Sequence, residues 1–269
     1  MSDTDHLHEL TEVLRSRRLE VDLVEDTLNV SQGTGIMAHK AHLDPRPLLD
    51  ILSDDEAHRR RQIAAYASGV KHVLLEPARS KAAQWDFIKS AGGLLPGLHV
   101  STFELGVEAA AGESPWTLDF PGDLIVAYFI KLDRGIRVLT APQVQRWDVS
   151  DDRITSAARS LLFHNTRHQT FQPFGDTQSV RRLHAGDGHD AARCLVIADA
   201  FYTEIDSGFR FSLPTPDHFL CVFNNNDETM AELSAATKEV YRDADYPLSE
   251  TLFRFESGRP LPLEETDHE

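Results

Sequence analysis

The densest group of polar side chains lies in the segment HAGDGHDAAR, which begins at His184 and ends at Arg193. Its imidazoles and carboxylates are residue types that bind metals or move protons, and its glycines let the backbone turn tightly. As a metal site, it would offer His184, Asp187 and His189 as ligands. As an anion site, it would offer Arg193 and the start of a following helix. Alternatively, Asp187 or Asp190 caps that helix, and we favour the cap because the sequence shows no ligands converging from a second segment.

A second polar pair, Asp217 and His218, follows a proline-rich stretch between two predicted strands. An aspartate in a turn needs no catalytic role. If this pair met the segment HAGDGHDAAR in one cleft, the combined groups could support acid–base hydrolysis. The candidate ligand-binding residues are therefore His184, Asp187, His189, Asp190, Arg193, Asp217 and His218. The sequence assigns no catalytic residue, no metal site and no cofactor.

Three other features carry weaker signals. His164 and His168 are four residues apart but lack the glutamate of an HExxH motif, so we predict a surface loop. Cys194 and Cys221 belong to no CxxC pair, which favours two buried apolar thiols over a disulfide or a zinc site. The arginine run 59–61 is typical of a solvated helix surface, with anion binding as the alternative.

Several catalytic motifs are absent from the sequence. It contains no GxxxxGK[ST] phosphate loop, no GxGxxG after a strand and no GxSxG nucleophile turn. These absences argue against the enzyme classes that carry such motifs, and they leave open whether the chain is an enzyme.

The composition is typical of a globular protein, at 269 residues with 41% hydrophobic and 26% charged residues. The chain has 27 Lys and Arg against 43 Asp and Glu, a formal charge of −16, which would repel a phosphate backbone. We therefore expect no general nucleic-acid binding. This length suits one or two domains, and we predict an N-terminal region 1–121 and a C-terminal region 122–269, or one continuous domain.

No apolar run approaches the roughly 20 residues of a membrane helix, because the longest covers only residues 124–130. Residues 1–10 are acidic and polar, unlike a secretory signal. We expect a cytoplasmic protein without membrane contact.

Periodicity and turn residues predict the elements that must position these side chains. Apolar spacings of three and four indicate helices. The predicted helices cover residues 54–75, 151–163, 190–205 and 227–240. Alternating runs with turn residues between them indicate hairpins. The predicted hairpins cover residues 19–30, 123–140, 209–223 and 251–263, and residues 99–107 form a further strand. The order favours an α+β fold, with a mainly antiparallel sheet built from hairpins and about four to five helices packed on it.

The second half of the chain resembles the YtpQ-like family of bacterial proteins. The resemblance rests on the start of the segment after residue 189, with Asp190, Ala191 and Arg193, and on the later hairpin with Asp217 and Leu220 after Pro214 or Pro216. It covers residues 122–226 best. The resemblance implies a cytosolic bacterial setting and transfers no catalytic or binding residue, because the family has no agreed activity.

We rank first a non-enzymatic module that binds a protein partner or a small anionic ligand, because the chain is acidic, has several hairpin edges and lacks catalytic motifs. The alternative is a hydrolase whose polar site combines residues 184–193 with Asp217 and His218. A third hypothesis is an acidic module that neutralises a basic partner.

Overall fold

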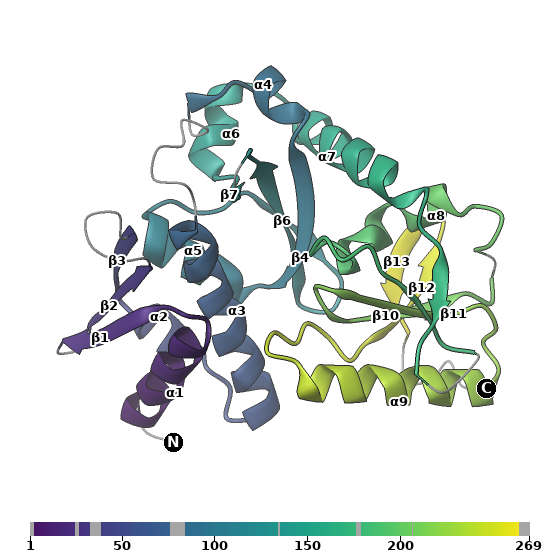
Figure 1. Ribbon diagram of the computed structural model, residues 1–269, viewed down its shortest axis with the longest axis horizontal. Coiled ribbons are helices and arrows are strands. Elements are labelled where there is room, and N and C mark those ends of the chain that lie inside the picture. The colour runs from purple at the N-terminus through teal and green to yellow at the C-terminus, as the bar shows by residue number, and fades with distance from the viewer. Residues whose placement is uncertain are drawn as a thin grey trace. The chain divides into compact units, whose positions relative to one another are not determined.

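A computed structural model describes residues 3–24, 27–32, 39–75, 84–133, 135–175, 179–205 and 207–263 (Figure 1). The chain divides into two compact units. The first comprises Met1–Leu94, Val100–Thr117 and Ala127–Ile154, and the second comprises Leu95–His99, Leu118–Val126 and Thr155–Glu269. The predicted boundary between residues 121 and 122 stays a prediction, because compactness does not show that either part folds alone.

The first unit combines helices with a small antiparallel sheet of order β1-β2-β3. Its elements are α1 (Asp3–Ser16), β1 (Glu20–Val24), β2 (Thr27–Gln32), β3 (His39–Leu43), α2 (Arg46–Leu49), α3 (Glu56–Leu74), α4 (Phe87–Ala91), α5 (Thr102–Ala111), β7 (Ile136–Val138) and α6 (Ala141–Trp147). The sheet registers Val21 opposite Val30 and Val30 opposite Ala41. These three buried side chains share one core with Leu10 and Leu14 of α1 and with the apolar face of α3.

Helices α3 and α5 pack with their backbones unusually close. A Cβ atom at Gly106 of α5 would overlap the carbonyl oxygen of Tyr66, and one at Gly69 of α3 would overlap the carbonyl oxygen of Phe103. The helix α3 begins at Asp55, whose carboxylate accepts a hydrogen bond from the N–H of His58. An acidic residue thus caps α3, and glycine is required where α3 and α5 meet.

A second sheet has the order β4-β6-β5, with β7 paired to β6. Its strands β4 (Leu94–Val100), β5 (Thr117–Phe120) and β6 (Leu124–Lys131) contribute residues to both units. Strand β6 is buried along almost its whole length, as its continuous apolar sequence predicts.

The second unit is built on a six-stranded sheet of order β13-β12-β10-β11-β9-β8. Its elements are α7 (Asp151–Thr166) from Thr155 onward, β8 (Phe171–Pro173), β9 (Arg181–Leu183), a 3₁₀ helix η3 (Ala191–Leu195), α8 (Ile197–Ala200), β10 (Arg210–Thr215), β11 (His218–Val222), α9 (Asp227–Asp243), β12 (Leu252–Glu256) and β13 (Arg259–Pro262). All of its strand pairs with an assigned register are antiparallel.

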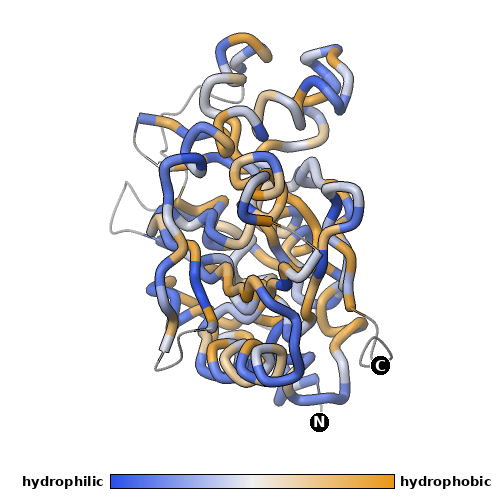
Figure 2. The backbone as a smooth tube through the Cα atoms, turned by 90° about the vertical axis from the view of Figure 1, so that its right-hand side faces the viewer, coloured by the Kyte–Doolittle hydropathy of each residue, from blue (hydrophilic) through white to orange (hydrophobic). Residues whose placement is uncertain are grey.

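The two faces of this sheet carry different side chains because residues alternate along each strand. One face packs on α9, where Leu220 and Val222 meet Met230 and Leu233. Helix α9 carries hydrophobic and hydrophilic residues around its circumference, as the bottom of Figure 2 shows. On the other face, Phe211 stacks with phenylalanines of neighbouring strands, at ring-centroid distances of 5.2 Å from Phe219 and 5.4 Å from Phe253.

The α+β class is confirmed, as are the helices α3, α7 and α9 and the strands of the four predicted hairpins. The turn at residues 25–26 lies outside the described residues. The prediction of about four to five helices is wrong, because the described part of the chain contains nine α-helices. No helix in that part combines the length and the apolar composition that a membrane crossing requires.

Two local predictions in the first unit are also wrong. Residues 99–107 were expected as a strand, but α5 begins at Thr102, because Phe103 and Val107 form one helical face against α3. The arginine run 59–61 was expected to be solvated, but Arg59 is only 7% exposed and Arg61 only 6%, so the prediction holds for Arg60 alone. The Nε atom of Arg59 lies 3.2 Å from Oε2 of Glu9, and its Nη1 atom donates to the carbonyl oxygen of Ser53.

Candidate functional site

The segment HAGDGHDAAR forms a loop between β9 and η3. Its glycines adopt left-handed conformations, with φ of 70° at Gly186 and 78° at Gly188, which other residues rarely adopt. The predicted helix 190–205 is wrong, because the chain forms the short helices η3 and α8 with Val196 between them. A 3₁₀ helix of this length offers no anion site of the kind expected at the start of a long helix.

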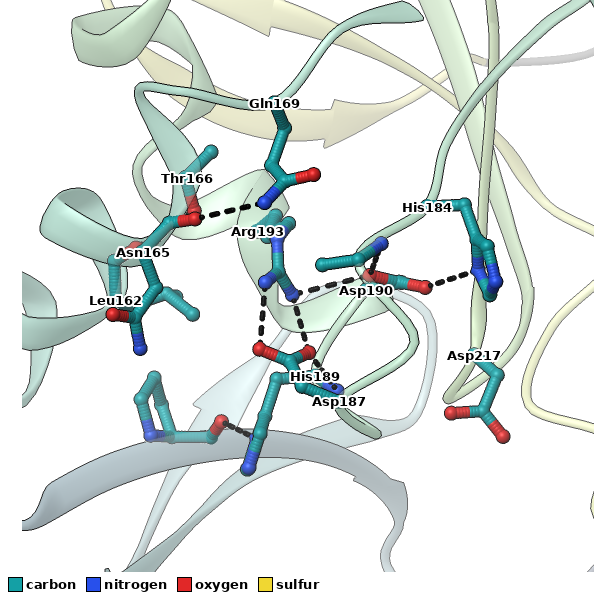
Figure 3. A network of polar contacts seen from close by, with 12 residues as sticks. Leu162, Asn165, Thr166, Gln169, His184, Asp187, His189, Asp190, Arg193 and Asp217 are labelled. Carbon is teal, nitrogen blue, oxygen red and sulfur yellow. Dashed lines mark hydrogen bonds and ion pairs between the residues drawn. The ribbon is translucent and has the colours of Figure 1, made fainter. Parts of the chain in front are cut away.

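A buried ion network holds the loop together (Figure 3). Arg193 is fully buried, and its guanidinium donates two parallel hydrogen bonds to Asp187, of 2.9 Å and 2.8 Å. Its Nη1 atom also lies 3.2 Å from Oδ1 of Asp190, which is fully buried as well. Arg193 was expected to bind an anion. Because its guanidinium is already paired with two carboxylates, it is not available to a ligand.

The carboxylate of Asp190 holds His184, and it does not cap the helix as predicted. Asp190 stands at the cap position of η3, but its side chain makes no cap hydrogen bond. Instead, Oδ1 accepts from the N–H of Ala185 at 3.0 Å, and Oδ2 lies 2.9 Å from Nδ1 of His184. An ionised carboxylate only accepts, so Nδ1 of His184 carries the hydrogen and Nε2 is the second ring nitrogen. The side chain of His184 is 43% exposed.

Asp187 faces both the network and solvent. Burial raises the pKa of its carboxyl, but the hydrogen bond and the charge of Arg193 outweigh burial, so the pKa lies below its usual value. Its Oδ1 atom also accepts from the N–H of His189. Asp187 therefore stays ionised and mainly stabilises Arg193.

His189 belongs to the interior and not to an open site. It is only 9% exposed, and its Nδ1 atom lies 2.9 Å from the carbonyl oxygen of Pro96. Burial lowers the pKa of His189 although the Pro96 carbonyl and Asp187 act in the opposite direction. Among the described residues, no group of three or more His, Cys, Asp and Glu side chains is arranged to hold a metal ion, which argues against the metal-ligand alternative for His184, Asp187 and His189.

The turn between β10 and β11 brings the second predicted pair, Asp217 and His218, close to the loop at residues 184–193. The N–H of Ala191 donates to the carbonyl oxygen of Pro216 at 2.9 Å, which ties the start of η3 to this turn. Figure 3 shows Asp217, which is exposed, near His184. The strand register pairs Leu183 with Phe219, and continuing it places His184 opposite His218.

The pKa of His218 is lowered, first by burial and also by the nearby charges of Arg182 and His184, while Asp217 and Asp190 oppose the shift. The Nδ1 atom of His218 lies 2.8 Å from Oγ1 of Thr215. Its Nε2 atom is therefore the remaining ring nitrogen, as it is in His184.

Sequence reasoning missed Arg182. The register sets Arg182 opposite Leu220, and alternation along β9 places it on the same face as His184 and His218. The side chain of Arg182 forms no hydrogen bond or ion pair with any residue within the described ranges, and its Nε atom is buried. The sequence signal that could have found Arg182 is its position two residues before His184. Residues at this spacing share a face only if the segment is a strand. Strand β9 is three residues long and was not predicted.

The weaker candidates do not join this site. His164 lies on α7, so the predicted loop is wrong there, and its ring centroid is 6.2 Å from that of His168. Both side chains are exposed. Cys194 and Cys221 are buried as predicted, and burial raises the pKa of both thiols.

The structure thus places Arg182, His184 and His218 on the sheet face that also carries Leu220, with Asp217 in the adjoining turn. Asp187, Asp190 and Arg193 form the ion network of the loop that holds His184. No protein-family model matches the chain, and no curated protein and no solved structure is significantly similar to it. The resemblance to the YtpQ-like family, the cytoplasmic location and a protein partner stay predictions.

Proposed function

We propose that this chain binds a small anionic ligand on the face that Arg182, His184 and His218 share. The observation that carries the proposal is that Arg182 has no carboxylate partner among the described residues, whereas Arg193 has two. A guanidinium is a fixed fork of donors that suits phosphate and carboxylate oxygens. The Nε2 atoms of the two imidazoles can donate to the same ligand when they carry a proton.

The charge balance favours an anion with a single negative charge. One guanidinium matches one such charge, while the exposed carboxylate of Asp217 disfavours more. The formal charge of −16 repels polyanions at long range, but repulsion between exposed charges is screened beyond about 8–10 Å at physiological salt. A small ligand in direct contact with Arg182 meets mainly the local groups.

The pKa of His218 adds a pH dependence to this binding. Its lowered pKa means that His218 is mostly neutral at neutral pH, and protonation at lower pH adds a positive charge beside Arg182. The anion should therefore bind more tightly as the pH falls. The groups that act on His218 are Arg182, His184, Asp190 and Asp217.

Isothermal titration calorimetry with dimethyl phosphate, which carries one negative charge, tests the proposal. Replacing Arg182→Gln should weaken binding by about 10-fold or more, because a hydrogen bond to a charged group contributes about 1.5–3 kcal/mol. The matched control is Arg181→Gln, which removes the same charge from the adjacent residue on the opposite face of β9. Equal weakening by both variants, or no binding to the unaltered chain at millimolar ligand, would contradict the site.

A further inference from the structure

The pair of His184 and Asp190 has a geometry that simple anion binding does not require. Asp190 is fully buried and accepts hydrogen bonds from Ala185 and His184, with Arg193 beside it. His184 is half-exposed and presents Nε2 away from the carboxylate. A buried carboxylate on Nδ1 fixes the tautomer and ring orientation and stabilises the imidazolium that forms when Nε2 takes a proton.

We propose that this face hydrolyses a small phosphodiester, with His218 as the general base and His184 as the general acid. The inference rests on the proposed anion site, since Arg182 would hold the phosphoryl oxygens. A diester carries the single negative charge that the guanidinium of Arg182 matches. A polynucleotide is disfavoured by the charge of −16. This activity replaces the non-enzymatic hypothesis and gives the hydrolase alternative a substrate class.

The step balances without a metal, an oxidant or a covalent intermediate. Nε2 of neutral His218 takes a proton from water while the water oxygen bonds to phosphorus. The bond from phosphorus to the leaving oxygen breaks, and that oxygen takes the proton from Nε2 of the His184 imidazolium that Asp190 holds. The products are a phosphomonoester and an alcohol. Proton exchange with solvent returns both imidazoles to their starting forms.

Each neighbouring residue then has a separate task. Arg182 binds the substrate and stabilises charge on the phosphoryl oxygens in the transition state. Asp190 is a positioning residue for His184, and Arg193 lies beside its carboxylate as a counter-ion. His189 has no part, because it is buried against Pro96.

The test measures nitrophenolate release from bis(p-nitrophenyl) phosphate, with EDTA present to remove stray metal ions. His184→Gln should lower kcat by about 10²- to 10⁴-fold, the usual contribution of a general acid. His184→Asn is the second variant, because the asparagine amide can still donate to Asp190 while Nε2 is lost. Circular dichroism checks that both variants fold, and Arg181→Gln is the control that should keep full turnover.

Dimethyl phosphate binding separates the two proposals. Binding without turnover of the diester by the unaltered chain overturns the hydrolysis and leaves the anion site standing. Turnover that persists in both His184 variants also overturns it. Absence of both binding and turnover overturns both proposals. Loss of turnover in the His184 variants, with dimethyl phosphate affinity within about 3-fold of the unaltered chain, supports the hydrolysis because one hydrogen bond accounts for such a change in affinity.

Discussion

The contact between α3 and α5 in the first unit and the loop at residues 184–193 in the second are both buried, but they depend on different physics. Gly69 and Gly106 let two helix backbones touch, and no charge is involved in that contact. The loop buries Arg193 and Asp190 completely and compensates their charges with Asp187 and His184. The helix contact should therefore be sensitive to added volume, and the loop to a lost charge.

A second ion pair sharpens this comparison. Arg59 is buried like Arg193, but its carboxylate partner Glu9 has a side chain that is 28% exposed. A carboxylate that reaches water recovers solvation when its partner is removed, whereas Asp190 does not. Burial of both partners, and not of the arginine alone, makes the loop dependent on its charges.

The largest effect is expected from Arg193→Met, which leaves Asp190 buried without its cation. We expect the free energy of unfolding to fall by about 3–5 kcal/mol, the usual cost of breaking a buried ion pair from one side. Urea denaturation followed by circular dichroism measures it. The matched variant Arg59→Met should cost only about 1–2 kcal/mol, because Glu9 stays partly solvated. Equal losses would show that exposure of the carboxylate partner does not decide the cost.

A smaller loss in the free energy of unfolding is expected from Gly106→Ala, which adds volume where α3 and α5 meet. The new methyl group would overlap the carbonyl oxygen of Tyr66, and such overpacking typically costs about 1–3 kcal/mol. All three tryptophans of the chain, Trp85, Trp116 and Trp147, belong to the first unit, so their fluorescence reports the change there.

The control for this substitution is Gly92→Ala. Gly92 has a φ of −70°, and a Cβ atom there meets nothing within 4 Å. Alanine at this position should leave stability unchanged or raise it slightly. A similar loss in both variants would mean that the glycine contact does not limit the packing of α3 and α5.

The smallest effect is the pH dependence that His189 contributes. Its folded-state pKa lies below the ordinary 6.5, so the unfolded chain binds more protons in the window between the two values. The contribution to stability is therefore fully present above pH 6.5 and is lost as the pH falls toward the folded-state pKa. One group adds at most about 1.4 kcal/mol per pH unit.

Urea denaturation at a series of pH values measures that slope. His189→Asn should flatten it, because asparagine can still donate to the Pro96 carbonyl but does not titrate. The residual slope comes from His218, whose pKa is also lowered. An unchanged slope in the variant would show that His189 does not contribute to the acid sensitivity.

Strong local signals predicted much of the fold. Apolar spacing predicted α3 and α9, and turn residues such as Ser257 and Gly258 predicted the last hairpin. Where the hydrophobic pattern was short, tertiary packing decided whether the segment formed a helix or a strand. Residues 99–107 alternate well enough for a strand, but contact with α3 favours the helix α5. The helix α1 was missed although Leu10 and Leu14 are four residues apart.

For the candidate site, the sequence by itself determined the residue types and their density: the polar segment from His184 to Arg193 and the pair of Asp217 and His218. It did not determine which of them face solvent. The tertiary structure turned Arg193 inward onto two carboxylates, buried His189, and left Arg182 beside His184 and His218. The physical reason is that pairing across β9 and β11 sets which side chains share a face, and this pairing joins residues more than 30 positions apart.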